Sequence, residues 1–327
     1  MNESLIDIPV LLIFFTRPDT FRAVFEKVRA ARPSTLFLAC DGPREGNDTD
    51  VQKIEECKKI AENIDWNCTV YQNYAERNMG CGMRPQSAIS WAFETVDRLV
   101  ILEDDCVPSN SFFGYAAELL EKYKDDERIG MISGLNHFKE WDCGGNSYCF
   151  TRNGAIWGWA TWRRVWEKYD YSVNAINDNY TKRLLEYNLT GTKAAKKAKI
   201  KRIKNTNNRV KSGEAVSYWD FQFGFLKVTN SYLQIVPACN QITNIGVGEG
   251  ATHFSRVTQN KWEKGMLYFM PSEELDLPLT HPKTVMCDYR YTEEVDKIIG
   301  YPNFFRKNYR RAKRLLLLLF HRKEKQE

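Results

Sequence analysis

The chain has 327 residues, of which 43% are hydrophobic and 13% aromatic, and its formal net charge is +5. This composition excludes a disordered or fibrous protein, because such chains lack the apolar side chains that a core requires. The length fits one large domain, or one domain with a sizeable appendage. The nine cysteines include no C-x-x-C pair, which favours a reducing compartment over a disulfide framework or a structural zinc site.

The apolar segments near the two ends are short. The N-terminus lacks the basic stretch and small-residue cleavage site of a signal peptide, and its apolar run over residues 8–15 has the length of a strand. Residues 315–320 form a run of six apolar residues, far below the roughly 20 that a membrane-spanning helix needs. We therefore expect no membrane span.

Up to residue 135, short β-rich apolar runs alternate with helix-periodic segments, a pattern typical of βαβ units in a mostly parallel sheet. Strands are predicted over residues 9–15, 35–39, 68–71, 99–102 and 131–134, with helical periodicity over 21–28, 54–61, 88–92 and 112–120. A further strand is predicted over residues 233–236.

The fourth strand ends in three acidic residues, Glu103, Asp104 and Asp105. Adjacent carboxylates repel one another, so such a triplet favours a nearby cation or metal-bound phosphate. In open α/β sheets, ligands bind at the carboxyl ends of the strands. The alternative interpretation is a solvated acidic turn.

Aromatic residues are concentrated over residues 148–171. Trp157 stands next to Gly158, which suggests an indole on a loop that approaches a ligand closely, as in a sugar-stacking platform. For Trp157 and Trp159, the sequence fits a position in the core and a position in the binding site equally well. Trp162 and Trp166, four residues apart, are instead expected on the core face of one helix.

Three later features add candidate residues. Residues 193–211 hold nine basic residues and no acidic one, and form either a solvated basic helix and loop or a lid over an anionic ligand. Asp220 follows Tyr218 and Trp219 in an otherwise uncharged stretch, where aromatic neighbours would shield it from water. His253 follows a glycine-rich loop, which makes it a candidate ligand, although a lone histidine is more often a surface or core residue.

Taken in order, these motifs resemble a GT-A fold nucleotide-sugar glycosyltransferase. They are strand-TRP, strand-CDGP, an Asn-x-Gly turn, strand-EDD, an FFxY helix, a Gly-Trp segment and Trp-Asp. The block VILEDDCVPSNSFFGY resembles the N-acetylglucosaminyltransferase I family, and residues 8–255 are similar to bacterial cell-surface polysaccharide transferases. We expect a catalytic domain over 1–260, with a nucleotide-binding half to 135, an acceptor half from 136 and a basic insertion at 193–211. Residues 261–327 would form a C-terminal extension.

The resemblance implies a role for each matching residue. Asp105 would bind the metal, Asp104 would face the ribose or sugar, and Glu103 would orient the site. Asp220 would be the catalytic base, and His253 a further metal or diphosphate contact. The remaining residues would bind the nucleotide (Thr16, Arg17, Asp41, Asn78, Gly80, Arg84) or the sugar and acceptor (Trp157, Trp159, Trp219).

The predicted function is therefore transfer of a sugar from a nucleoside-diphosphate sugar, with UDP-sugars favoured, to a saccharide or lipid-linked saccharide. Mn²⁺ or Mg²⁺ would be the cofactor, and the transfer would be inverting and serve cell-surface polysaccharide synthesis. The alternatives are a non-catalytic transferase-like scaffold, a carbohydrate-binding protein or a sugar nucleotidyltransferase. A Rossmann dehydrogenase is excluded because Thr-Arg-Pro-Asp, not a glycine-rich turn, follows the first strand. No nucleic-acid recognition motif is present.

The C-terminal tail, residues 301–323, combines aromatics, a leucine run and many basic residues. It is predicted to be a basic amphipathic helix that binds an anionic membrane surface, or else docks on the domain. Residues 306–323 carry eight positive charges and residues 193–211 carry nine, so the rest of the chain is strongly acidic. The expected location is cytoplasmic, with the tail offering peripheral attachment to the inner membrane.

Overall fold

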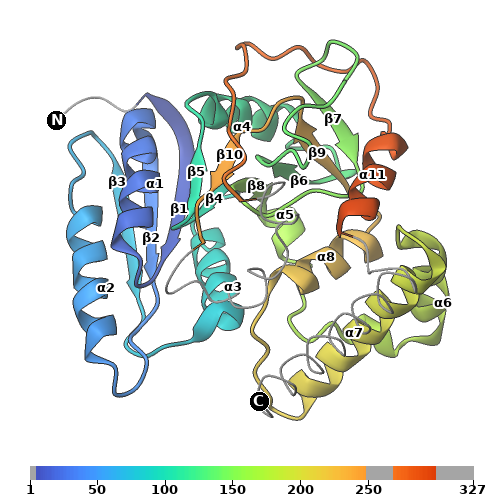
Figure 1. Cartoon of the computed structure of the whole chain (residues 1–327), viewed down its shortest axis with the longest axis horizontal. Coiled ribbons are helices and arrows are strands. Elements are labelled where there is room, and N and C mark those ends of the chain that lie inside the picture. The colour runs from blue at the N-terminus through green and yellow to red at the C-terminus, as the bar shows by residue number, and fades with distance from the viewer. Residues whose placement is uncertain (1–4, 248–267, 300–327) are drawn as a thin grey trace, which may run out of the picture.

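A single mixed sheet of eight strands forms the centre of the molecule, in the order β3-β2-β1-β4-β8-β6-β9-β7 (Figure 1). The computed structural model describes residues 5–247 and 268–299, so the predictions for His253 and for the tail beyond residue 299 lie outside the described residues. Within these ranges, no helix combines the length and the apolar character needed to cross a bilayer.

The first half of the sheet is parallel, as the sequence predicts. It comprises β1 (Ile6–Phe14), β2 (Pro33–Cys40), β3 (Thr69–Tyr74) and β4 (Arg98–Glu103). Strand β1 lies between β2 and β4, with Phe14 paired to Cys40 and Ile13 paired to Glu103. Because the three strands run in the same direction and in register, the residues that follow them emerge side by side at one edge of the sheet.

The second half of the sheet contains two antiparallel strands that the sequence did not reveal. Strand β8 (Trp159–Trp162) runs antiparallel to both β4 and β6 (Ile129–Ser133), and β7 (Tyr148–Thr151) runs antiparallel to β9 (Leu233–Pro237). Strands β6 and β9 are parallel, so the sheet as a whole is mostly parallel. A separate ribbon pairs β5 (Cys106–Pro108) with β10 (Ile242–Asn244).

One prediction about the tryptophans is wrong in its element but right in burial. Trp162 is the last residue of β8, whereas Trp166 ends the short helix α5 (Arg163–Trp166), so the two do not share a helix face. Both side chains are nevertheless buried in the main core. The spacing of four residues is compatible with a strand followed by one helical turn, which periodicity alone does not distinguish from a helix.

Helices flank the sheet and follow the predicted periodicity. They are α1 (Pro18–Ala31), α2 (Asp48–Ala61), α3 (Gly80–Phe93) and α4 (Ser111–Lys122). In α1, Phe21, Val24, Phe25 and Val28 are all buried, and each such side chain contributes about 1.5–3 kcal/mol of burial free energy. Proline at the start of α1 suits the first helical turn, where no N–H partner is needed.

A helical unit packs beside the second half of the sheet (Figure 1). It consists of η1 (Asn174–Asn177), α6 (Asn179–Asn188), α7 (Lys193–Lys211) and α8 (Asp220–Thr229). Its own small core is built from Val173, Ile176, Leu185, Leu189, Ile203 and Phe225. The basic segment 193–211 is thus a single helix held by an apolar cluster, not a free loop.

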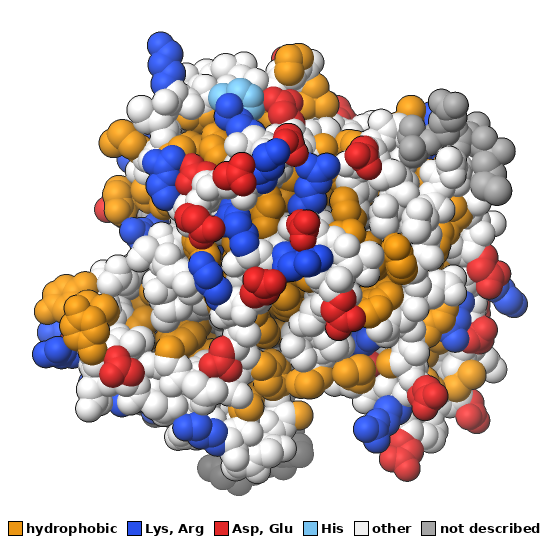
Figure 2. All heavy atoms as spheres, turned by 180° about the vertical axis from the view of Figure 1, so that it is seen from behind, with side chains coloured by type: hydrophobic (Ala, Val, Ile, Leu, Met, Phe, Trp, Pro, Cys, Tyr) orange, Lys and Arg blue, Asp and Glu red, His pale blue; other side chains and the backbone are white. Residues whose placement is uncertain are grey.

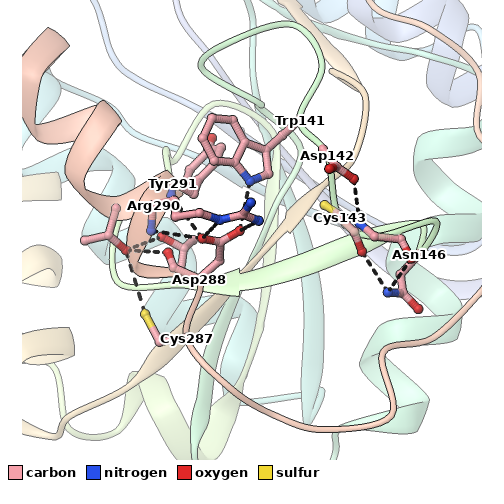
Figure 3. A network of polar contacts seen from close by, with 11 residues as sticks. Trp141, Asp142, Cys143, Asn146, Cys287, Asp288, Arg290 and Tyr291 are labelled. Atoms are coloured by element: carbon pink, nitrogen blue, oxygen red, sulfur yellow. Dashed lines mark hydrogen bonds and ion pairs between the residues drawn. The ribbon is translucent and has the colours of Figure 1, made fainter.

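The segment 268–299 packs against the sheet, although the sequence analysis assigned it to an extension. Helix α11 (Tyr289–Ile299) buries Tyr291 and Val295 against Val236 of β9. Asp288 secures its start, because the carboxylate accepts hydrogen bonds from the Trp141 indole at 3.0 Å and from Arg290 at 2.9 Å (Figure 3). Residues on this segment can therefore contribute to a site on the main body.

Candidate active site

A cavity of about 410 Å³ opens where the carboxyl ends of β2, β1 and β4 meet. The sheet order changes direction here, because the chain places β2 and β3 on one side of β1 and β4 on the other. Such a switch point is the common ligand site of open α/β sheets. The cavity is lined by twelve residues singled out from the sequence: Thr16, Arg17, Asp41, Asn78, Gly80, Arg84, Glu103, Asp104, Asp105, Trp157, Trp219 and Asp220.

The acidic triplet forms the inner wall of this cavity, where Arg17 is its direct counter-charge. The Arg17 guanidinium pairs with Asp104 and also donates to Asp105 Oδ2 at 2.8 Å. The backbone N–H of Phe15 donates to Asp104 at 3.4 Å. The end of β1 thus delivers one cation to the end of β4, which follows from the parallel pairing of the two strands.

One guanidinium does not balance three carboxylates. Burial raises the pKa of Glu103 to about 8, and the charges of Asp105 and Asp104 add to the effect. Burial likewise raises the pKa of Asp104, although Arg17 opposes this shift. Burial alone would lower the pKa of Arg17, but the two aspartates outweigh it and the pKa is raised. The cluster therefore has an excess of negative charge that a further cation would relieve.

The donor set suits a hard divalent cation. Asp105 is half-buried, lines the cavity and offers carboxylate oxygens, the ligands that Mg²⁺ and Mn²⁺ prefer. Asn244 donates to Asp105 at 3.4 Å, and a side chain at Gly246 would overlap the Asp105 carboxylate. Residues 5–247 and 268–299 contain no group of three or more His, Cys, Asp or Glu side chains arranged to hold a metal. A metal at this position would therefore take few ligands from the protein, and its other ligands would be oxygens of a bound small molecule.

Asp41 and Asn78 line the cavity but are largely occupied with each other. The Asp41 carboxylate accepts from the backbone N–H groups of Met79 at 2.8 Å and Gly80 at 3.0 Å, and from the Asn78 amide at 3.1 Å. Burial raises the pKa of Asp41, although these hydrogen bonds oppose the shift. Asp41 therefore caps the start of α3, and the N–H of Gly80, the first residue of that helix, is not available for a diphosphate.

Arg84 is buried, with 3% of its surface exposed. Its guanidinium donates to the side chain of Asn73 at 3.1 Å and to the Asn73 carbonyl, while Nε has no hydrogen-bond partner among the described residues. Burial lowers the pKa of Arg84. A buried cation that faces the cavity is suited to an anionic ligand group.

Asp220 also lines the cavity and is the first residue of α8. Its side chain is exposed, contrary to the expectation that the neighbouring aromatics shield it. Gly82 helps to explain its position, because a Cβ there would overlap the carbonyl of Val216. Only glycine lets α3 approach the segment before α8 this closely. Asp220 and the acidic triplet therefore line the same cavity, although they come from distant parts of the chain.

Of the three tryptophans predicted to contact the sugar or acceptor, two line the cavity and one does not. The Trp157 ring is half-buried and lies 5.0 Å from the Tyr268 ring at the cavity wall. Trp219 lines the cavity, although it is 3% exposed and packs on Trp159. Trp159 itself is 1% exposed and belongs to the core beside Trp166, so it has no free face for a sugar. Its place in a buried strand, between β4 and β6, is the reason.

Comparisons with known proteins identify no family. No family model and no curated protein matches the sequence. Among solved structures, the chain is similar to a UDP-glucose pyrophosphorylase complexed with UDP-glucose, at 9% sequence identity. The similarity covers 49% of this chain and 78% of that chain, with a TM-score of 0.29. So loose a superposition carries no argument about function, and the site must be judged by its own geometry.

Among the lining residues that the sequence analysis did not single out are Arg44, Tyr218 and Tyr268. Arg44 reaches the cavity while paired with Asp50 at 2.6 Å, and Tyr268 arrives from the segment beyond residue 267. Tyr218 also lines the wall. Tyr218 was visible as a neighbour of Asp220, but nothing in the local sequence of Tyr268 distinguishes it from a core aromatic.

Proposed function

We propose that this chain is a metal-dependent glycosyltransferase that uses a nucleoside-diphosphate sugar, with a UDP-sugar as the favoured donor. The observation that carries the proposal is one cavity lined both by the acidic triplet and by the exposed Asp220. A donor sugar bound in this cavity would have its leaving diphosphate beside the triplet, and the attacking hydroxyl of the acceptor would lie beside Asp220.

The acidic triplet and the arginines beside it would bind the leaving group. Asp105 would hold Mn²⁺ or Mg²⁺, with Asp104 and Arg17 setting its position through their ion pairs. The metal would supply Lewis-acid stabilisation of the charge that develops on the departing diphosphate. Arg84 would add a fixed positive charge to the same side of the cavity.

Asp220 would activate the acceptor. The acceptor oxygen forms a bond to C1 of the sugar while the bond from C1 to the diphosphate breaks, and the hydroxyl proton passes to Asp220. Attack from the side opposite the leaving group inverts the configuration at C1. Asp220 forms no ion pair or hydrogen bond through its side chain with the other described residues, so its carboxylate is available to accept this proton. Trp157 would stack on a sugar ring in the same cavity.

Titration calorimetry with UDP and MnCl₂ tests the donor half of the proposal. UDP is expected to bind in the presence of Mn²⁺ and much more weakly with chelator, and Asp105→Asn should abolish the metal dependence. Asp125→Asn, an exposed carboxylate on the loop after α4, is the matched control and should bind like the wild type. UDP binding that ignores both the metal and Asp105 would contradict the proposal.

A product analysis then separates the enzyme classes. Incubation with nucleotide sugars and Mn²⁺ should slowly release the nucleoside diphosphate and free sugar through transfer to water. Formation of nucleoside triphosphate when pyrophosphate is added would instead identify a sugar nucleotidyltransferase. Binding of nucleotide sugar without any product would identify a binding protein.

A further inference from the structure

A second cavity, of about 570 Å³, adjoins the first. Trp157, Ile156 and Asp220 line both cavities, so the two meet at the proposed catalytic base. The walls of the second cavity come from residues 152–157 and from helices α7 and α8. The helical unit around α6 and α7 is therefore the feature that encloses it.

The charge of this second cavity is positive. Its cationic side chains are Arg152, Lys199, Arg202 and Lys227, against the carboxylates of Asp220 and Asp296. We call it the basic cavity, and the first one the acidic cavity. Lys199 is paired with Asp296 at 3.3 Å. In the part of the chain that the structure describes, no carboxylate lies within ion-pair distance of the other three cations.

Arg202 is held in place by aromatic rings. Its guanidinium carbon lies 4.2 Å from the centre of the Phe221 ring and 4.6 Å from that of Tyr218. Stacking fixes the plane of the guanidinium and leaves its N–H groups at the edge for another partner. A planar fork fixed in this way is suited to bind a carboxylate or phosphate through two hydrogen bonds.

Lys227 places a second cation in the wall, with only 9% of its surface exposed. Its Nζ donates to Gln234 Oε1 at 2.9 Å and to the sulfur of Met131 at 3.5 Å, both of which are neutral. Burial lowers the pKa of Lys227 to about 7. A buried ammonium without a counter-ion is costly, and an anion in the cavity would offset that cost.

The remaining walls suit a saccharide. The half-buried Trp157 offers aromatic surface, while Asn153, Asn188 and Thr190 offer amide and hydroxyl groups. Sugars present apolar ring faces and hydroxyl edges, so they pack on such mixed walls. The basic cavity thus provides a saccharide surface together with counter-charges for an acid.

We propose that the basic cavity binds an acceptor saccharide that carries an acid group, a carboxylate or a phosphate, with Arg202, Arg152 and Lys227 as the counter-charges. The saccharide would extend past Trp157 so that one hydroxyl reaches Asp220. This inference rests on the proposed transferase function, because it assigns the acceptor of that same reaction.

Calorimetry with three small probes tests the inference directly. Glucuronic acid and glucose 6-phosphate carry the two acid groups, and glucose carries neither. At equal ionic strength, at least one acidic probe should bind about tenfold or more tightly than glucose, because charge-assisted hydrogen bonds are the strong ones. The acidic probe that binds more tightly shows whether the acid group is a carboxylate or a phosphate. Equal binding of all three, or no binding of any, would overturn the inference.

Two substitutions locate the binding. Arg202→Ala should weaken the preferred acidic probe by about tenfold. Lys204→Ala removes a charge from the same helix, at an exposed position that does not line the cavity, and should change the affinity less than about twofold. Arg152→Ala provides a second variant from another element. Equal effects of Arg202→Ala and Lys204→Ala would point to general charge attraction and overturn the assignment.

Competition with UDP separates this inference from the proposed function. Saturating UDP and Mn²⁺ should not displace the acidic probe, because the two ligands occupy different cavities. Displacement would place the acid in the acidic cavity and overturn the inference. If UDP fails to bind while the acidic probe does, the transferase function fails and the anion site stands.

Discussion

The acidic cavity and the basic cavity share Trp157 and Asp220 but differ in charge. The acidic cavity has the carboxylates of Asp41, Glu103, Asp104, Asp105 and Asp220 against three arginines, and the basic cavity has four cations against two carboxylates. The formal net charge of +5 conceals this separation. Under the proposed function, the ligand of the acidic cavity would bring a cation with it, and the ligand of the basic cavity would bring negative charge. Asp220 would be the proton acceptor at the boundary between them.

The largest expected effect concerns the boundary between the cavities. Asp220→Asn should lower the transfer rate by about 10²–10⁴-fold, since an amide does not accept the proton of the acceptor hydroxyl. Its affinity for UDP and Mn²⁺ should match the wild type, because Asp220 is not among the residues proposed to hold the metal or the diphosphate. Turnover with a nucleotide-sugar donor and calorimetry with UDP are the two measurements.

Glu186→Gln on α6 is the control for that substitution, as its side chain is exposed and lines neither cavity. Near-normal turnover of Asp220→Asn would remove this residue from the mechanism and with it the shared role of the two cavities.

The next effect concerns the charge balance of the acidic cavity. Arg17→Gln leaves Asp104 and Asp105 without their cation, which should cost about 3–5 kcal/mol of unfolding free energy. Addition of Mn²⁺ should restore more stability to this variant than to the wild type, since the metal would replace the lost charge. Urea denaturation with and without Mn²⁺ measures both quantities.

Arg29→Gln breaks the exposed pair with Asp65 and should cost less than about 1 kcal/mol. If Arg17→Gln costs no more than Arg29→Gln, the triplet does not depend on a neighbouring cation and the contrast between the cavities fails.

A third effect tests the basic cavity through pH. The pKa of Lys227 is about 7 in the fold, because the side chain is buried, whereas in the unfolded chain it lies near the usual lysine value of 10.5. Between these values the unfolded chain binds more protons, so this lysine makes the protein less stable at pH 7 than at pH 10. Lys227→Met should therefore raise stability at pH 7, on the order of a few kcal/mol, and the gain should shrink as the pH rises.

The measurement compares urea denaturation of wild type and Lys227→Met from pH 7 to pH 10. Lys204→Met, at an exposed position on α7, should show no such pH-dependent difference. A gain that stays constant over this range would mean that Lys227 is not a buried cation.

The smallest effect concerns the position of the boundary. Gly82→Ala inserts a methyl group against the carbonyl of Val216 and should cost about 1–3 kcal/mol, as overpacking does. It should also lower turnover, because the segment that carries Asp220 must shift. Gly224→Ala within α8, where a Cβ meets nothing within 4 Å, should be neutral or stabilising. Thermal denaturation and turnover with the same donor distinguish the two variants.

The residues predicted for the site lie together at the acidic cavity because many of them follow neighbouring strands. Arg17, Asp41 and Asp105 come directly after apolar runs that could only be buried parallel strands, so their meeting at one edge followed from chain order. The roles of these residues remain predictions. Apart from Trp159, every predicted site residue in the described ranges lines this cavity.

Other features could not be predicted, because the local pattern of residues does not show which distant segments will pack beside them. Trp157 and Trp159 stand on either side of Gly158 in the sequence. In the structure, however, Trp159 is buried in the core and Trp157 lines the acidic cavity. Lys227 looks like an ordinary helical lysine in the sequence, and only its packing on Met131 and Gln234 shows that it is buried.

By itself, the sequence determined the parallel half of the sheet and the acidic end of β4, since apolar periodicity and charge placement are local properties of the chain. Tertiary structure alone decided that α7 would enclose a basic cavity and that Asp220 would stand between it and the acidic one. These arrangements join residues from distant segments, such as Gly82 with Val216 and Arg202 with Phe221, through packing that no short stretch of sequence specifies.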